Sequence, residues 1–364
     1  MVISGPSLVP VMRPRLPCLD AVADRLRSVE RSGWYTNFGP QERELRLRFA
    51  EFLGVSDDRV ATASSATLGL QGAVAASPAS LWTVPSFTFP ATPAAVLQAG
   101  AELCFGDITP QDWWLDPTIS ETADEAAGLI PVAPFGAPIE LERWDSSREV
   151  IIDAAASLGA RMPDLNRLPA TWAVVFSLHA TKCLPAGEGG LVVFGNPARA
   201  EWFRAWSNFG LQDSRDAQMV PTNAKLSELA SVYAHASLDA WPRIRSEWED
   251  ARHRTDHLER EHELVGQPGP RPDVSPFWVV VLPDRAATVA VERAMLRHGV
   301  DTRRWWSDGC HRMPAFEGHR RAALPVTEST TVRALGLPMF RGLDTEHTTR
   351  ISAALAEARS PGGR

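Results

Sequence analysis

The first two thirds of the chain alternate two hydrophobic periods, one helical and one strand-like. In residues 41–54, Leu45, Phe49, Phe52 and Leu53 recur on one helical face, and the pattern stops at Gly54. Helices are also predicted over 65–76 and 88–100. Short apolar runs typical of buried strands cover residues 59–64, 80–84, 101–108, 126–135, 148–155, 172–178 and 189–195. Strands that alternate with helices indicate an α/β sheet covered on both faces.

The pattern changes after about residue 225. Residues 225–241 predict a helix that ends at Pro242, and residues 243–266 predict a long charged helix. The remainder, from 275 to 358, predicts the order β-α-β-α, with its strands near 275–283 and 301–306. We therefore expect a large domain over 1–240 and a smaller domain over 241–364, with the charged helix as their connection.

Composition excludes several classes of protein. The 364 residues are 44% hydrophobic, which is enough for two packed domains, and the net charge of −7 comes with no basic cluster, so no nucleic-acid partner is expected. No apolar run reaches the roughly 18 residues of a membrane span. The start has no secretory pattern. Cys18, Cys104, Cys183 and Cys310 lack metal-ligand spacing, which predicts no metal site and a cytoplasmic location.

Two residues suggest the chemistry. Asp153 ends a predicted strand, and Lys182 follows the next strand in a Pro/Gly-rich turn. Because the carboxyl ends of strands line the ligand crevice of an open α/β sheet, both side chains could face one pocket. A desolvated lysine can form a Schiff base, and a buried carboxylate can pair with a pyridinium nitrogen. The pair therefore suggests pyridoxal phosphate (PLP), although a lysine on a surface hairpin is the simpler alternative.

Two further segments favour the cofactor. Ser64–Thr67 lies where a predicted strand gives way to a helix, and a helix N-terminus offers free N–H groups to a phosphate. Ordinary N-capping by Ser65 would produce the same residues. Phe87 and Phe89 follow another strand, and one of them could stack on an aromatic ring, the alternative being packing in the core.

An ordered set of motifs resembles the DegT/StrS-type family of PLP-dependent nucleotide-sugar aminotransferases. The motifs are WYTNFGPQERELRLRFAEFLGV, ASSATLGL, VPSFTFPAT, IPVAPFGAP, IIDAAASLGA, FSLHATKCLPAGEGGLV and TNAKLSE, over residues 34–228. Residues 299–316 and 324–340 resemble the family more loosely. The resemblance implies a type I aminotransferase fold, with a central seven-stranded, mostly parallel sheet in the large domain and a smaller C-terminal α+β domain. It also implies a homodimer whose two active sites are shared.

The resemblance assigns roles to individual residues. Lys182 is the expected Schiff-base lysine and Asp153 the expected partner of the pyridine nitrogen. Phe89 is expected to stack on the ring. The residues expected at the cofactor phosphate are Ser65, Ala66, Thr67, Ser177 and, from the neighbouring subunit, Asn223.

The sequence departs from the family pattern beside the ring. Ala66 replaces a common glycine in the phosphate turn. Ala156 stands where many members have Gln or His, which leaves that contact to water or to His179. His179 is more simply a packed neighbour of the lysine, and Glu188 is more simply a residue that caps its turn.

The expected reaction is transfer of an amino group from glutamate to a keto-sugar nucleotide, most of all a 4-keto-6-deoxyhexose. Amination at C3, a cyclitol substrate, a PLP-dependent dehydratase and a PLP-binding regulator without turnover are the alternatives. Lysine at position 182, rather than histidine, favours transamination. Candidate substrate contacts are Trp34, Tyr35, His179, Glu188, Arg215, Lys225, Arg303, Arg304, Trp305 and Trp306.

Overall fold

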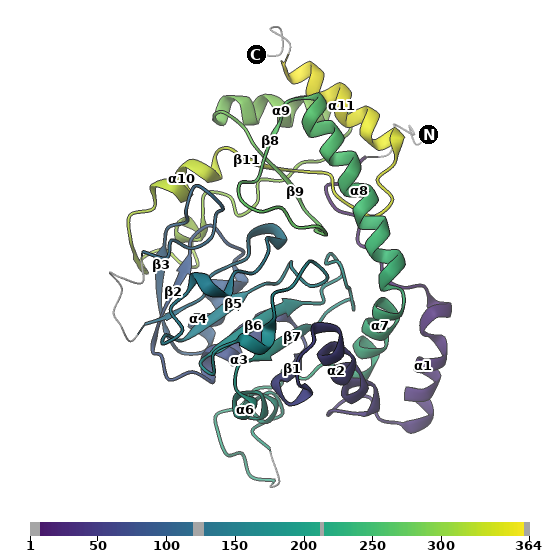
Figure 1. The fold of residues 1–364 in the computed structure, drawn as a ribbon, viewed down its shortest axis with the longest axis vertical. Coiled ribbons are helices and arrows are strands. Elements are labelled where there is room, and N and C mark those ends of the chain that lie inside the picture. Colours follow the sequence, from purple (N-terminus) through teal and green to yellow (C-terminus); the bar gives the residue numbers. More distant parts are fainter. Residues whose placement is uncertain (1–7, 119–126, 212–214, 360–364) are drawn as a thin grey trace.

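A central sheet organises the larger part of the molecule (Figure 1). The computed structural model describes residues 8–118, 127–211 and 215–359. Seven strands of the sheet match the predicted apolar runs, with β2 extending one residue beyond its run, and they have the spatial order β1-β7-β6-β5-β4-β2-β3. β7 is antiparallel to both neighbours, and the other pairs are parallel. The strands are β1 (Val60–Ala63), β2 (Leu81–Pro85), β3 (Glu102–Gly106), β4 (Gly128–Leu129), β5 (Val150–Asp153), β6 (Trp172–Ser177) and β7 (Gly190–Phe194).

An eighth strand was not predicted. β10 (Arg320–Arg321) pairs in parallel with β3 at the edge of the sheet. Both of its residues are exposed, so no hydrophobic pattern marks the strand in the sequence. The sheet therefore has eight strands in the described residues, and the C-terminal part of the chain supplies the last one.

The sheet separates two hydrophobic cores, because successive side chains of a strand point to opposite faces. In β6, Trp172, Val174 and Phe176 enter one core, whereas Ala173 and Val175 enter the other. The helices of this part are α1 (Leu19–Ser32), α2 (Pro40–Leu53), α3 (Ala66–Ala75), α4 (Ala91–Gln98), α6 (Pro197–Ser207) and α7 (Glu228–Asp239). Short 3-10 helices occur at Asp57–Arg59, Pro134–Gly136, Leu141–Arg143, Leu165–Arg167 and Cys310–Arg312.

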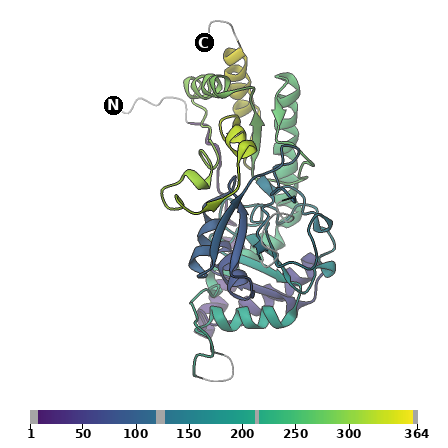
Figure 2. The same cartoon turned by 90° about the vertical axis from the view of Figure 1, so that its left-hand side faces the viewer.

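The prediction of a layered α/β sheet is confirmed, since α3, α4 and α6 pack on one face and α2 on the other. Figure 2 shows the same layers from the side. α2 begins with Pro40 in its first turn and ends at Gly54 in a left-handed conformation, as the pattern of that segment predicted.

The C-terminal part contains a second, antiparallel sheet with the order β11-β9-β8. Its strands are β8 (Val265–Gly266), β9 (Trp278–Val281) and β11 (Ala334–Leu337), and its helices are α8 (Trp241–Glu261), α9 (Arg285–Arg297), α10 (Pro325–Thr331) and α11 (Thr345–Arg359). The long α8 leads from the large sheet to this part (Figure 1). Pro242 stands in the first turn of α8, so the predicted break at this residue is a junction between two helices.

The predicted strand at 301–306 is wrong. Only Arg303 pairs there, in an isolated bridge with Gly336. Trp306 and Ser307 have φ values of 63° and 47°, which is left-handed backbone that an extended strand does not accommodate.

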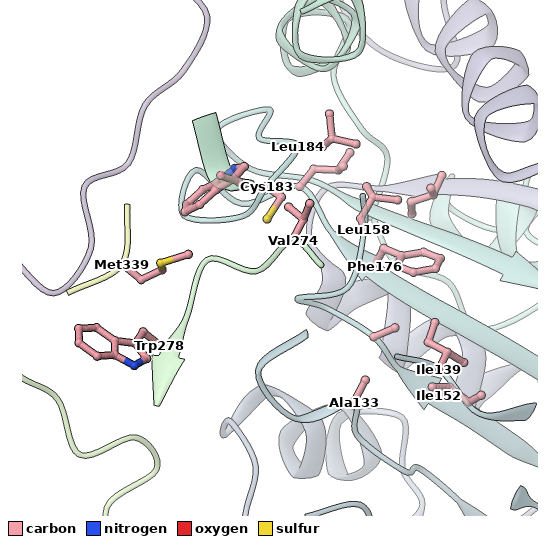
Figure 3. Packing of buried hydrophobic residues seen from close by; sticks show 14 of the residues in the cluster. Ala133, Ile139, Ile152, Leu158, Phe176, Cys183, Leu184, Val274, Trp278 and Met339 are labelled. Carbon is pink, nitrogen blue, oxygen red and sulfur yellow. The ribbon is translucent and has the colours of Figure 1, made fainter. Parts of the chain in front are cut away.

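The two sheets share one continuous core. That core includes Ile152 and Phe176 of the large sheet as well as Trp278 and Met339 of the C-terminal part (Figure 3). At the beginning of the described chain, Val9 bridges Val300. The division at residue 240 therefore stays a prediction. None of the helices in the described ranges combines the length and apolar character needed to cross a membrane.

Candidate active site

The carboxyl edge of the large sheet gathers the predicted site residues. Asp153 ends β5, and Ser177 ends the adjacent β6. In β5, Ile151 enters the core beneath α3 and α4 and Ile152 enters the opposite core, so alternation turns Asp153 toward α3 and α4. In β6, Phe176 enters the same core as Ile152, so Ser177, the next residue, points to the opposite face of the sheet. Both side chains therefore face the same side of the sheet.

Asp153 is a buried acid that is held by hydrogen bonds. Its side chain is 5% exposed. Oδ2 accepts a hydrogen bond from Thr92 Oγ1 at 2.8 Å, and Oδ1 accepts one from the Ala155 N–H at 3.1 Å. Burial raises the pKa of Asp153, and these hydrogen bonds and the charge of Lys182 oppose that rise. A ligand cation placed beside the carboxylate would offset the cost of burying its charge.

Lys182 lies in the connection between β6 and β7. Its Nζ is 5.1 Å from the ring centroid of Phe277, and it has no hydrogen-bond or ion-pair partner among the described residues. Burial lowers the pKa of Lys182, while the charge of Asp153 raises it. The next residue, Cys183, is 1% exposed and fixes the backbone in the core beside Leu184 and Val274 (Figure 3). The amine is therefore held on an anchored loop and shifted toward its nucleophilic, neutral form.

The N-terminus of α3 forms a cradle for an anion. Ser65 caps the helix by accepting a hydrogen bond from the Leu68 N–H at 3.2 Å. The N–H groups of Ala66 and Thr67 have no acceptor among the described residues. Gly190, the first residue of β7, backs this turn so closely that a Cβ there would lie 2.5 Å from Ser65 O and 2.8 Å from Ala66 N. The cradle is the type of site that helix ends offer to phosphate.

Ser177 lies at the same turn. Its position in β6 is opposite Gly190 of β7. Ser177 Oγ accepts a hydrogen bond from the His179 N–H at 3.2 Å, which leaves its own proton available to a phosphate oxygen.

The two phenylalanines of the β2–α4 connection have different environments. Phe87 is 1% exposed and packs edge-on against Trp306 at 4.6 Å between ring centroids. Phe89 is 61% exposed, which leaves its ring available for a ligand. Phe87 is therefore a core residue, and Phe89 remains the prediction for the stacking ring.

Asn223 and Lys225 lie close to the phosphate turn. The carbonyl of the intervening residue, Ala224, accepts a hydrogen bond from the Ser64 N–H at 2.7 Å. Asn223 is exposed, and its Oδ1 accepts a hydrogen bond from Lys225 Nζ at 2.7 Å. That contact directs the amide N–H groups of Asn223 away from Lys225. Whether they reach a neighbouring subunit stays a prediction.

His179 and Glu188 contact each other within the lysine loop. His179 Nδ1 lies 2.8 Å from Thr181 Oγ1, and its Nε2 lies 3.6 Å from Glu188 Oε1. These contacts favour the structural alternative for both residues. Ala156, which stands where many members of the family have Gln or His, is 9% exposed.

Some candidate substrate residues are already bonded to other side chains, whereas others are exposed and could contact a substrate. Arg304 forms a two-pronged ion pair with Glu292, at 2.7 and 2.5 Å, so its guanidinium is already occupied. Arg303 is exposed, and its guanidinium carbon lies 5.0 Å from the Trp305 ring centroid. Trp305 itself packs edge-on against Phe277.

The remaining candidates lie on other surfaces. Trp34 and Tyr35 are 42% and 51% exposed in the connection between α1 and α2. Trp34 lies against Arg43, and the Tyr35 carbonyl accepts a hydrogen bond from the Glu228 N–H. Arg215 is exposed. No contact in the described residues joins these three side chains to Asp153 or Lys182.

Three residues of the site were not assigned a role from the sequence. Thr92 binds Asp153, Gly190 backs the phosphate turn and Phe277 faces Lys182. The doubled glycine of GEGG was a signal for Gly190, because only glycine permits so close an approach between backbones. Thr92 and Phe277 carry no local signal.

The residues fit PLP. A buried carboxylate suits the pyridinium nitrogen, the turn at Ala66 and Thr67 suits the phosphate, and Lys182 suits the aldehyde carbon. In the described ranges, no group of three or more His, Cys, Asp or Glu is arranged to hold a metal ion. This fold and this donor set define a PLP-dependent enzyme of the type I aminotransferase class.

Comparison with known proteins agrees. Residues 20–356 match the DegT/DnrJ/EryC1/StrS aminotransferase family. The chain is 28% identical to the dTDP-3-amino-3,4,6-trideoxy-alpha-D-glucose transaminase of Streptomyces venezuelae, over 94% of this chain and 96% of that protein. A crystal structure of DesI with its TDP-sugar product superposes with a TM-score of 0.84 at 29% identity and covers 98% and 94% of the two chains. A Bacillus cereus ATCC 10987 protein assigned as a PLP-dependent aminotransferase reaches a TM-score of 0.88 at 26% identity, over 96% and 100%.

The chain belongs to the DegT/DnrJ/EryC1/StrS aminotransferase family, and it is a PLP-dependent aminotransferase. The predicted family, fold class and cofactor are confirmed.

Proposed function

We propose that the protein transfers an amino group from glutamate to the ketone of a nucleoside-diphosphate-linked 4-keto-6-deoxyhexose. The observation that carries the proposal is the unpaired amine of Lys182 on the sheet edge that also holds Asp153 and the phosphate turn. The similarity to a dTDP-sugar transaminase and to a structure with a TDP-sugar product supports a nucleotide-sugar substrate. Amination at C3 and a cyclitol substrate are the alternatives.

Each residue has a distinct task in this proposal. Bound PLP supplies an aldehyde that exchanges amines and a ring that withdraws electrons from the substrate carbon. Asp153 keeps a proton on the ring nitrogen. Ala66, Thr67 and Ser177 donate to the phosphate, and Phe89 covers one ring face. The free amine of Lys182 would carry a proton from the carbon of the amino donor to the cofactor, and later from the cofactor to the carbon of the acceptor.

The shared contacts are part of the proposal as well. We place the protein in the cytoplasm as a homodimer, with Asn223 donating to the phosphate held by the partner. Among the arginine candidates, Arg303 is favoured over Arg304 for the substrate diphosphate, because Arg304 is paired with Glu292.

The test uses absorbance and mass spectrometry. Purified protein with PLP should absorb near the edge of the visible range, and Lys182→Ala should lose that band. Addition of glutamate should convert the wild-type spectrum, and a panel of keto-sugar nucleotides should then gain nitrogen. A wild type that never shows the band would refute the role of Lys182.

Two outcomes would support other functions. Loss of a hydroxyl group without gain of nitrogen would indicate a dehydratase. Binding of PLP without conversion by any amine would indicate a binding protein. This binding function is the second candidate. It is favoured by Ala156, which stands where many family members have Gln or His, and by 26% identity, over 75% of this chain and 76% of that protein, to a pleiotropic regulatory protein of Geobacillus stearothermophilus.

A further inference from the structure

A chain of buried hydroxyl groups ends on the carboxylate of Asp153. Thr88 Oγ1 lies 2.9 Å from Thr92 Oγ1, and Thr92 Oγ1 lies 2.8 Å from Asp153 Oδ2. Both threonines are completely buried. A threonine hydroxyl has one proton, and that of Thr92 is donated to the carboxylate, so the contact between the threonines requires Thr88 as the donor. The chain therefore has a fixed direction, from Thr88 through Thr92 to Asp153.

The loop that carries Thr88 is held by the C-terminal part of the molecule. The Cys310 N–H donates to the Ser86 carbonyl at 2.9 Å, and the Cys310 thiol donates to the Thr88 carbonyl at 3.1 Å. His311 Nδ1 lies 2.6 Å from Ser86 Oγ. All of these residues are at most 3% exposed. The backbone on both sides of Phe87 is thereby fixed, and with it the start of the hydroxyl chain.

We propose that Thr88 and Thr92 are positioning residues that orient the Asp153 carboxylate and hold the shared proton on the ring nitrogen of PLP. The proposal rests on the assignment of Asp153 to that nitrogen. In a buried site the proton can reside on the nitrogen or on the carboxylate. A hydroxyl that donates to the carboxylate stabilises its charged form, and chains of hydrogen bonds strengthen one another. The ring then keeps its positive charge and withdraws electrons from the substrate.

The experiment measures where the proton resides. Wild-type protein and Thr92→Val are loaded with PLP labelled with ¹⁵N in the ring, and the ¹⁵N chemical shift distinguishes a pyridinium from a neutral pyridine. The wild type should show the pyridinium. Thr92→Val should move toward the neutral ring, and its conversion by glutamate should slow about tenfold or more, as expected for losing a hydrogen bond to a charged group. PLP affinity should change less.

Two further variants separate positioning from packing. Thr92→Ser keeps the hydroxyl and should restore the wild-type shift. Thr255→Val makes the same change at a completely buried threonine of α8 whose hydroxyl donates to the Arg252 carbonyl, and it should leave the shift unchanged. If Thr92→Val does not fold, Thr88→Val removes the first donor and should give a smaller shift in the same direction.

A ¹⁵N shift in Thr92→Val equal to that of the wild type would overturn the proposal. So would an equal effect of Thr255→Val. The measurement needs only bound PLP, so failure to aminate any sugar would count against the proposed substrate and not against these positioning residues. A neutral ring in the wild type would count against the role of Asp153 itself.

Discussion

Gly190→Ala should damage the phosphate site from behind. The added Cβ would lie 2.5 Å from Ser65 O and 2.7 Å from Ser65 C, whereas ordinary contact begins at 3.4 Å. The neighbouring atoms are backbone, so the turn itself must retreat by almost 1 Å. Overpacking of this kind costs about 1–3 kcal/mol of unfolding free energy.

The same displacement should weaken PLP binding. A donor of the turn that moves by almost 1 Å no longer matches its phosphate oxygen, because the N···O distances of such hydrogen bonds span only about 2.7–3.2 Å. A hydrogen bond to a charged group contributes about 1.5–3 kcal/mol, so loss of one bond raises Kd about 10- to 150-fold. Titration of cofactor-free protein with PLP, followed by absorbance, measures this change.

Gly69→Ala is the matched control. It adds the same methyl group within α3, where the nearest atoms are the side-chain methyl groups of Val175 and Val192 at 3.1 Å. Its PLP affinity should stay within about threefold of wild type, since no backbone donor of the turn is displaced. If Gly190→Ala binds PLP as tightly as Gly69→Ala, the turn is not the phosphate cradle.

Three further predictions follow from the charges. Arg303→Ala should raise KM for the sugar nucleotide, whereas Arg304→Ala should lower unfolding free energy by about 1 kcal/mol through its lost ion pair; equal KM effects would contradict this. Burial lowers the pKa of His235 to about 4 in the folded protein, below its ordinary value of 6.5. The free energy of unfolding should therefore fall as pH falls from 6.5 toward 4, and an NMR titration of the folded protein that gives His235 a pKa near 6.5 would refute this expectation. Burial raises the pKa of Asp153 above its ordinary value of 3.8, so the folded protein resists ionising this carboxyl group. The cofactor-free wild type should therefore lose unfolding free energy relative to Asp153→Asn as pH rises above 3.8, and urea unfolding at several pH values measures the difference.

Local signals in the sequence were enough for the main elements of the fold. The apolar runs located all seven strands of the predicted sheet to within one residue, and the cap at Ser65 located the start of α3. The strand ends predicted that Asp153 and Lys182 lie at one edge of the sheet, whereas Ser177 was assigned only through the family resemblance. These features depend on neighbouring residues and on alternation along a strand, which a single sequence displays.

Contacts between distant segments could not be predicted. Thr92 meets Asp153 across 61 positions, and Cys310 meets Thr88 across 222. The strand β10 consists of two exposed arginines whose pairing depends on the edge of β3. The ion pair between Arg304 and Glu292 likewise depends on how α9 packs. In each case the tertiary arrangement, and not the local pattern, decides the partner.

The reversed direction of β7 ties the lysine loop to the phosphate turn. Because β6 ends and β7 begins at the same edge, residues 178–189 leave the sheet beside Ser177 and return to it at Gly190. Cys183 anchors the middle of this loop in the core. A shift of β7 against β6 would therefore displace the amine and the support of the phosphate turn together.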